Sequence, residues 1–362
     1  MTTFPIPGKR KGKWPVAVLG ATGAVGQMFV RMLANHPWFE IVALAASERS
    51  AGKKYGEVTR WLEGPPPPDN IQSMRVIACD PGVVNASIAF SALDATAAGE
   101  VEMAFAKAGK FVLSNAKNYR MEPDVPLVIP EVNGDHLALI ECQRRNRGWD
   151  GAIVTNANCS ATVAAVALAP LHESYGIKQL FLSTMQAVSG AGYPGVPSLD
   201  ILGNVIPYIA DEEPKLEREM LKLLGSYADD EVTSAAFKVS AHTNRVAVEH
   251  GHTICMSIGF SEAPTPEQAI ETMRKWEGYA PTKGLPTRPQ RPLVVTDAVD
   301  RPQPKRDVSA GNGMTVTVGR VRRDAILDLR MVALGHNTVR GAAGGSVLNA
   351  ELLASTGVLD TV

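Results

Sequence analysis

Short apolar runs alternate with segments of helical spacing along the first third of the chain. Trp14–Leu19 is almost continuously apolar, and the segment QMFVRMLA that follows at 27–34 has the apolar spacing of a helix. Alternation of this kind is typical of a parallel sheet with helices on both faces. The pattern predicts strands at 14–19, 40–46, 87–93 and 110–113, and helices at 27–34 and 100–108. We therefore expect an N-terminal α/β domain.

From about Asn158 to His336 the pattern changes to one apolar helix followed by several strand-like stretches. The last two stretches are separated by Arg323–Ala325, a hairpin signal. The pattern predicts strands at 179–185, 236–240, 253–260, 314–322 and 326–333, and a terminal helix at 341–354. Pro-rich segments at 64–69 and 280–304 predict exposed connections. The second block should be an α+β domain whose sheet could also serve as a subunit interface.

The composition narrows the possible functions. The chain has 362 residues, 45% of them hydrophobic, which favours two domains. Charged residues make up 20% and the formal net charge is −1, so we expect no nucleic-acid partner. The four cysteines are scattered without a CxxC pair, which favours a reducing compartment over a disulfide framework or a zinc site.

The N-terminal segment superficially resembles a secretory signal. Lys9, Arg10, Lys11 and Lys13 precede the apolar run Val16–Leu19. That run is short and enters a glycine-rich turn, so a first strand explains it better. No apolar stretch approaches the roughly 20 residues that span a bilayer. We expect a cytoplasmic protein without a membrane segment.

A glycine-rich turn directly follows the first predicted strand and opens the first helix. Its G-x-x-G-x-x-G spacing is a variant of the Rossmann fingerprint, in which glycines let backbone N–H groups approach a pyrophosphate at the helix N-terminus. An ordinary tight turn is the alternative. The expected dinucleotide contacts are Gly20, Thr22, Gly23, Ala24, Val25 and Gly26.

The end of the second strand bears on the choice between NAD and NADP. An acidic residue there accepts the ribose 2′-OH of NAD. Here Ser47, Arg49 and Ser50 can donate to a 2′-phosphate, and Arg49 offers a bidentate positive partner. Glu48 lies among them and points the other way. The segment favours NADP, with a solvated charged turn as the alternative.

Cys159 is the sharpest candidate for chemistry. Polar residues precede it and a helix-like run follows it, so it should lie at a helix N-terminus. Partial positive charge there lowers the pKa of a thiol, and a thiolate can attack an aldehyde and pass hydride to a nicotinamide. Asn158 and nearby backbone N–H groups could bind the developing oxyanion. The other three cysteines are expected to be structural.

Two further segments carry polar residues at the ends of strands. Gln186 ends a strand before the glycine turn 190–192, which could place it beside a substrate. Arg245, His250 and His252 offer a cation and two acid/base candidates. In one regular strand Arg245 and His252 would face opposite sides, so a break at Gly251 or earlier is needed.

Taken together, the motifs resemble the aspartate-semialdehyde dehydrogenase family, in its archaeal and fungal branch. The likeness covers nearly the whole chain. It rests on the ordered set GATGAVG, SNAKNYRM, VIPEVN, NANCSAT, MQAVSGAG, NRVAVEHGH and GHNTVRGAAGG. It implies an NADP-binding domain over 1–157, completed by a C-terminal helix in 337–362, and a catalytic and dimerisation domain over 158–336.

The resemblance also implies roles for individual residues. Cys159 matches the nucleophile, His252 the general acid/base and Gln186 the residue that orients the intermediate, with Asn158 beside the nucleophile. The substrate- and phosphate-binding residues it implies are Arg120, Arg245, Glu219 and Lys222, with Lys215 as a rival for the lysine. The cofactor contacts it adds are Ser91, Asn115, Ser189, Gly190, Gly192 and Asn337.

The reaction implied by the resemblance is the reversible conversion of L-aspartate 4-semialdehyde, phosphate and NADP⁺ into L-4-aspartyl phosphate and NADPH. It belongs to the synthesis of lysine, threonine, methionine and isoleucine. The family implies a homodimer, often paired into a tetramer, and no metal.

Three alternatives stay open on the sequence. Malonyl-CoA reductase would use the same cysteine and NADPH but release CoA, although Arg120 and the Glu219/Lys222 pair favour phosphate. N-acetyl-glutamyl-phosphate reductase fits the glycine and cysteine motifs less well. A catalytically silent, NADP-binding regulatory paralogue is disfavoured because Cys159, His252 and Gln186 are all present.

Overall fold

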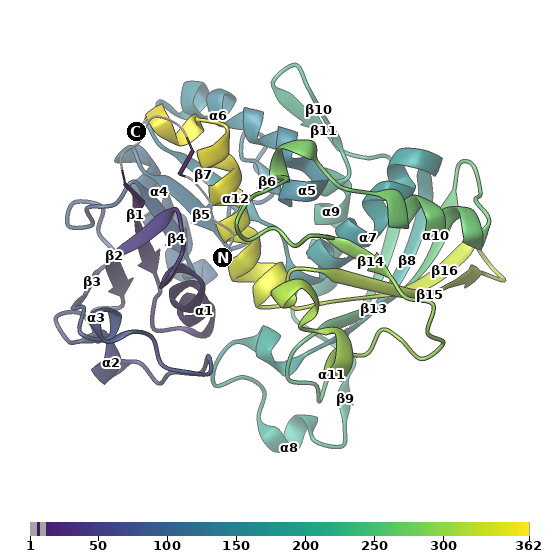
Figure 1. The fold of residues 1–362 in the computed structure, drawn as a ribbon, viewed down its shortest axis with the longest axis horizontal. Coiled ribbons are helices and arrows are strands. Elements are labelled where there is room, and N and C mark those ends of the chain that lie inside the picture. The colour runs from purple at the N-terminus through teal and green to yellow at the C-terminus, as the bar shows by residue number, and fades with distance from the viewer. Residues whose placement is uncertain (1–5, 8–11, 362) are drawn as a thin grey trace.

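The computed structural model describes residues 6–7 and 12–361. It contains two seven-stranded sheets, one in each half of the chain (Figure 1). The first is parallel and the second is mixed, which confirms the predicted fold class. Lys9, Arg10 and Lys11, the centre of the signal-like stretch, lie outside the described residues. Along the part that is described, no helix has the length and apolar content needed to cross a membrane.

The strands of the first sheet are all parallel, in the order β3-β2-β1-β4-β5-β7-β6. They are β1 (Trp14–Leu19), β2 (Phe39–Ala46), β3 (Val76–Ala78), β4 (Ile88–Ser91), β5 (Phe111–Ser114), β6 (Leu127–Val128) and β7 (Ala152–Asn156). The four strands predicted from the pattern correspond to β1, β2, β4 and β5. The prediction missed the other three. Of these, β3 and β6 have only three and two residues, which is too short for a hydrophobic period to show, whereas β7 has five and is longer than β4 and β5.

Helices cover both faces of this sheet because side chains alternate along each strand. Along β1, Trp14, Val16 and Val18 belong to one hydrophobic cluster, and Ala17 and Leu19 belong to another on the opposite face. The helices of this half are α1 (Ala24–Leu33), α2 (Tyr55–Val58), α3 (Asp69–Gln72), α4 (Ala95–Lys107), α5 (Pro130–Asn133) and α6 (Leu139–Arg147). Asp69 begins α3, so the expected irregular connection is one residue shorter than predicted.

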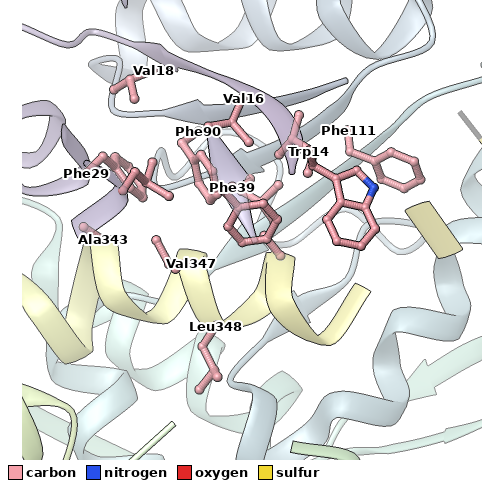
Figure 2. Close-up of a cluster of buried hydrophobic side chains, with 14 of the residues drawn as sticks. Trp14, Val16, Val18, Phe29, Phe39, Phe90, Phe111, Ala343, Val347 and Leu348 are labelled. Atoms are coloured by element: carbon pink, nitrogen blue, oxygen red, sulfur yellow. The ribbon is translucent and has the colours of Figure 1, made fainter. Parts of the chain in front are cut away.

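The C-terminal helix α12 (Gly344–Ser355) packs on the first sheet, although it follows the whole second half of the chain. Figure 2 shows Ala343 and Val347 turned toward Phe29 and Phe39. The helix is buried almost all round, which explains why its apolar pattern is not amphipathic. A π-helical turn, Val339–Ala343, leads into it beside Cys159.

The second sheet has the order β14-β15-β16-β13-β8-β12-β9. Its strands are β8 (Ile177–Gln186), β9 (Val205–Ile206), β12 (Lys238–Val246), β13 (His252–Phe260), β14 (Leu293–Val295), β15 (Val316–Arg323) and β16 (Leu329–Gly335). Helices α7 (Cys159–Tyr175), α9 (Glu212–Leu223) and α10 (Pro266–Lys275) pack on it. The remaining elements are the hairpin β10 (Ser226–Ala228) and β11 (Glu231–Thr233), and the short helices α8 (Ser198–Ile201) and α11 (Pro304–Asp307).

Two expectations for this half need correction. The Pro-rich stretch 280–304 is not only a surface excursion, because it supplies β14 as an edge strand, with Leu293 buried. The strand predicted at 236–240 begins at Lys238 and continues to Val246. Its exposed and half-buried residues alternate with buried ones, so its apolar content alone understates its length.

Arg245 and His252 lie on different strands. Arg245 is near the end of β12, and His252 is the first residue of β13, beyond Gly251 with φ +100°. Both strands pair with β8, one parallel and one antiparallel, at its Gln186 end. The break in the chain therefore brings both residues to one end of the sheet, as the sequence argument required.

Candidate active site

Cys159 is the first residue of α7. Asn158 is the N-cap, and its Oδ1 accepts hydrogen bonds from the N–H groups of Ser160 at 2.9 Å and Ala161 at 3.1 Å. The close approach of Gly341 fixes the position of the cysteine, because a Cβ at 341 would lie 2.6 Å from Cys159 Cβ. The sequence placed this residue correctly at a helix start.

His252 is the direct partner of Cys159. Its Nε2 lies 3.1 Å from Cys159 Sγ, and its Nδ1 accepts a hydrogen bond from the Ala187 N–H at 3.1 Å. Because Nδ1 receives a donor, the proton of the neutral ring is on Nε2. The ring is fully buried and aims that proton at the sulfur.

The ionisation of the pair differs from the sequence expectation. Burial, with the negative charge of Glu212, raises the pKa of Cys159 to about 12, and Arg120, Arg245 and the Ser160 N–H only partly oppose it. Burial, with Arg245 and His336, lowers the pKa of His252 to about 3. The prediction that the helix N-terminus gives a thiol of low pKa is therefore wrong, because burial outweighs the positive groups and leaves a thiol beside a neutral imidazole.

Glu212, the first residue of α9, is the polar centre that sequence reasoning missed. Its Oε1 accepts hydrogen bonds from the side-chain amides of Asn158 at 2.8 Å and Gln186 at 3.1 Å. Its Oε2 lies 3.6 Å from Lys215 Nζ. The Glu212 side chain is thus a buried carboxylate held between the two amides that flank the nucleophile.

Arg245 completes this part of the pocket. Its Nη1 donates to the Ala187 carbonyl at 2.8 Å, and its guanidinium is largely buried. Gly190 leaves room for it, because a Cβ there would lie 2.9 Å from Arg245 Nη1 and 3.1 Å from His252 Cε1. Any side chain at 190 would press on both residues.

The Glu219/Lys222 pair lies deeper than an anion-binding pair should. Lys222 Nζ donates to the backbone carbonyls of Arg120, Glu122 and Val125, each at 2.8 Å. Those three bonds use all three ammonium protons. Glu219 accepts from Arg120 Nη1 at 2.8 Å and from the Asn158 N–H at 2.6 Å. The pair therefore ties α9 to the loop after Arg120 and leaves Lys222 no proton for a phosphate.

A basic cavity of about 250 Å³ opens between α9 and residues 117–121. Its walls carry four cations, Lys117, Arg120, Lys215 and Arg218, and two carboxylates, Asp211 and Glu219. Arg120 also donates to the Asn115 carbonyl at 2.7 Å, so the cavity and the strand ends of the first sheet share one residue. This cavity has the charge and size to receive a phosphate group.

The dinucleotide cleft has a volume of about 900 Å³ and runs along the carboxyl ends of the first sheet's strands. Gly20, with φ +75°, leaves no room for a Cβ, which would lie 2.7 Å from the Ala92 carbonyl oxygen. A Cβ at Gly26 would meet the Gly20 carbonyl oxygen. Helix α1 has no side-chain cap, so its first N–H groups are left for a ligand. The predicted residues that line the cleft are Gly20, Thr22, Gly23, Ala24, Val25, Ser47 and Gly192.

The remaining predicted cofactor residues fall into two groups. Arg49 and Ser50 belong to the same turn as Ser47 but are not among the lining residues. Asn115 donates to the Ser91 carbonyl at 3.3 Å, and Asn337 donates to Ser189 Oγ at 2.8 Å. None of these four residues is among the described residues that line the cleft.

Comparison with known proteins decides which family this arrangement belongs to. The family model of the "Semialdehyde dehydrogenase, NAD binding domain" matches residues 15–140. The model of the "Semialdehyde dehydrogenase, dimerisation domain" matches residues 168–340. The aspartate-semialdehyde dehydrogenase of Archaeoglobus fulgidus is 52% identical over 341 residues, covering 94% of this chain and 98% of that protein. The chain belongs to the aspartate-semialdehyde dehydrogenase family.

Solved structures of aspartate-semialdehyde dehydrogenases agree. The crystal structure with NADP from Candida albicans is similar with a TM-score of 0.88 and 43% identity, covering 95% of this chain and 99% of that one. The enzyme II from Vibrio cholerae complexed with ASA has a TM-score of 0.74 and 25% identity, covering 95% and 98%. The resemblance stated from the motifs is thus confirmed, and the chain is an aspartate-semialdehyde dehydrogenase enzyme with an NAD-binding domain.

Glu212 had a signal in the sequence that the family resemblance left ambiguous. Glu212/Lys215 and Glu219/Lys222 are the same Glu-x-x-Lys pattern, repeated after seven residues of one helix. Seven residues are about two turns, so both pairs share one face. Only the contacts separate them. Glu212 accepts from the side-chain amides of Asn158 and Gln186, whereas Lys222 donates all its protons to backbone carbonyls.

Proposed function

We propose that Cys159 is the nucleophile of a reversible reductive dephosphorylation, in which L-4-aspartyl phosphate becomes L-aspartate 4-semialdehyde. The contact between Cys159 Sγ and His252 Nε2, at 3.1 Å and at a helix start, is the observation that carries the proposal. The V. cholerae relative complexed with ASA supports the same substrate. We infer that the reaction serves the synthesis of lysine, threonine, methionine and isoleucine.

In the biosynthetic direction the sulfur attacks the acyl carbon. The C–S bond forms, the bond from the acyl carbon to the phosphate oxygen breaks, and the thiol proton leaves on hydrogen phosphate. The Nε2–H of His252 donates to the sulfur and then faces the carbonyl oxygen, where negative charge develops next. Because its Nδ1 is occupied by the Ala187 N–H, the ring works as a donor from Nε2.

Substrate charge would raise the reactivity of the buried thiol. The pKa of about 12 comes mainly from burial and from Glu212. A substrate ammonium paired with Glu212 would neutralise that carboxylate and favour the thiolate. The nucleophile would then be activated by its own substrate rather than held ready as a thiolate.

Three charged groups of aspartyl phosphate each have a partner in the pocket. We assign the α-carboxylate to Arg245, the α-ammonium to Glu212, and the phosphate to Arg120 with Lys215. Lys215 replaces Lys222 in this scheme because all three Lys222 protons are donated to carbonyls. Glu219 orients Arg120, and Asn158 with Gln186 holds Glu212.

The cofactor that fits the cleft is a nicotinamide dinucleotide, and we propose NADP(H). The glycine turn is so tight that a Cβ at Gly20 or Gly26 would collide with backbone atoms, and it leads into helix α1, which has no side-chain cap. Ser47, Arg49 and Ser50 would hold the 2′-phosphate. The C. albicans relative, whose crystal structure contains NADP, supports this choice of cofactor. When bound, the nicotinamide donates or accepts the hydride. The residues we expect to hold that end are Ser91, Asn115, Ser189, Gly190, Gly192 and Asn337.

We further propose a homodimer, or two dimers joined as a tetramer, through the second sheet. One face of this sheet packs on α7, α9 and α10, and on the other face Phe181 and Cys255 are exposed. The dimerisation-domain match over 168–340 supports this use of the sheet. All four cysteines are free, in keeping with the expected cytoplasmic compartment.

The test of the proposed function is reduction of NADP⁺ by the purified protein with aspartate semialdehyde, with and without phosphate. Turnover that depends on phosphate supports the acyl-phosphate reaction. Absence of that turnover, together with oxidation of NADPH by malonyl-CoA, would keep the cysteine chemistry and overturn the substrate.

A further inference from the structure

The residues that directly follow β2 differ in whether they line the dinucleotide cleft. Ser47 and Glu48 line it, whereas Arg49, the next residue, does not. The glycine turn is bound to this strand end, because the N–H groups of Gly20 and Ala21 both donate to the Ala45 carbonyl, at 2.9 and 3.0 Å. Glu48 thus follows a strand whose end is hydrogen-bonded to the pyrophosphate turn.

This is the position from which Rossmann domains read the adenosine ribose. An acidic residue about 20 residues beyond the glycine motif accepts a hydrogen bond from the 2′-OH of NAD. Glu48 stands at that separation from Gly26. In the described part of the chain its carboxylate makes no hydrogen bond or ion pair, so both oxygens remain for a ligand.

The charge of the cleft wall points in the same direction. Among the described residues that line it, Glu48, Asp80 and Asp94 are acidic and none is Lys, Arg or His. The cation nearest in sequence, Arg49, is exposed, and its carbonyl accepts a hydrogen bond from Lys53 Nζ at 3.0 Å. A 2′-phosphate would enter beside carboxylates and would rely on Arg49 reaching in from outside.

We propose that Glu48 is a specificity-determining residue that gives this enzyme a second cofactor, NAD(H), alongside NADP(H). Glu48 accepts the ribose 2′-OH of NAD, and the same carboxylate repels the 2′-phosphate of NADP. Arg49 offsets that repulsion when NADP is bound. The inference rests on the proposed function, because it assumes that the cleft holds a nicotinamide dinucleotide.

The test is direct binding of NADH and NADPH, followed by the fluorescence of the reduced nicotinamide and independent of turnover. Wild-type protein should bind the two with Kd values within about tenfold of each other. Glu48→Gln removes the charge but not the shape, and should weaken NADH about tenfold while tightening NADPH. Glu48 is exposed, so the fold should tolerate the change.

Glu40→Gln is the matched control. Glu40 is an exposed carboxylate at the other end of β2, roughly 25 Å away along the strand. It should leave both Kd values unchanged. Wild-type preference for NADPH beyond a hundredfold, or the same effect from Glu48→Gln and Glu40→Gln, would overturn the role of Glu48. Failure of both nucleotides to bind would instead overturn the proposed function.

Discussion

Around Cys159 almost every polar side chain is held by another side chain, whereas the dinucleotide cleft is lined mostly by backbone and small residues. Glu212, Asn158, Gln186 and Glu219 form one hydrogen-bonded set beneath the nucleophile. In the cleft, Glu48 has no such partner among the residues that the structure describes. The reacting end is pre-organised by contacts far apart in sequence, and the cofactor end is shaped by local turns. Substitutions at the two ends should therefore have different effects.

The largest effect should come from Cys159→Ser. A serine hydroxyl is a far weaker nucleophile, and it would form an oxygen ester in place of the thioester. Turnover should therefore fall by at least about 10³-fold. NADPH binding should stay near the wild-type value because Cys159 does not line the dinucleotide cleft. Steady-state rates and nucleotide titration on the same preparation give both values. Equal loss of rate and nucleotide binding would indicate misfolding and break the separation of the two ends.

His252→Asn should have the next largest effect. It removes the Nε2–H beside the sulfur, and kcat should fall by roughly 10²–10⁴ while KM changes little. The measurement is the full rate curve against aspartate semialdehyde at saturating NADP⁺ and phosphate. An unchanged kcat would remove His252 from the chemistry.

Lys215→Met and Lys222→Met form a pair that tests the revised anion site. Lys215→Met should raise KM for phosphate about tenfold and leave the fold intact. Lys222→Met should strand three buried carbonyls and lower the free energy of unfolding by on the order of 3 kcal/mol. Phosphate titration and urea unfolding measure the two quantities. The reverse pattern would return the phosphate to Lys222.

The smallest effect concerns a buried carboxyl behind the cofactor end. Glu102 does not place its charge in the cleft. Its carboxyl accepts a hydrogen bond from Ser114 Oγ at 2.7 Å, and burial raises its pKa from 4.5 to about 7. A raised carboxyl pKa stabilises the fold below pH 4.5, and that stability is lost as pH rises through 7. In the wild type this titration should lower the free energy of unfolding by on the order of 3 kcal/mol between pH 5 and 8. Glu102→Gln should flatten this fall.

Urea unfolding at several pH values checks the Glu102 prediction. Wild type and Glu102→Gln should differ in slope across the pH range, with the two curves converging where Glu102 carries its proton. Parallel curves would mean that Glu102 titrates outside this pH range. Its ionisation would then make no contribution to stability at the cofactor end.

The same contrast explains what the sequence predicts well. The glycine turn and the helix start at Cys159 depend on a few consecutive residues, so their type and order were enough to locate them. Strands β1, β2, β4 and β5 of the first sheet were visible for the same reason. The parallel sheet and the second α+β domain followed from the change of hydrophobic period.

What the sequence could not give depends on contacts between distant segments. Glu212 and Glu219 occupy equivalent faces of α9, and only the packing of this helix shows which of them binds the side-chain amides of Asn158 and Gln186. The pKa of Cys159 is raised, where the sequence predicted that it would be lowered, because burial outweighs the positive charge of the helix N-terminus. Burial is a property of the whole fold. Asn158 was expected to bind an oxyanion, yet both ends of its side chain are already bonded.

The central claim is that Cys159 carries the substrate as a thioester, and direct detection of that adduct tests it most sharply. Aspartate semialdehyde and NADP⁺ are mixed with the enzyme without phosphate, quenched in acid and digested, and the cysteine peptides are weighed by mass spectrometry. The account predicts an aspartyl adduct on the Cys159 peptide, matched by the NADPH formed and removed when phosphate is added. NADPH formation without that adduct, or an adduct on Cys79, Cys142 or Cys255 instead, would contradict it.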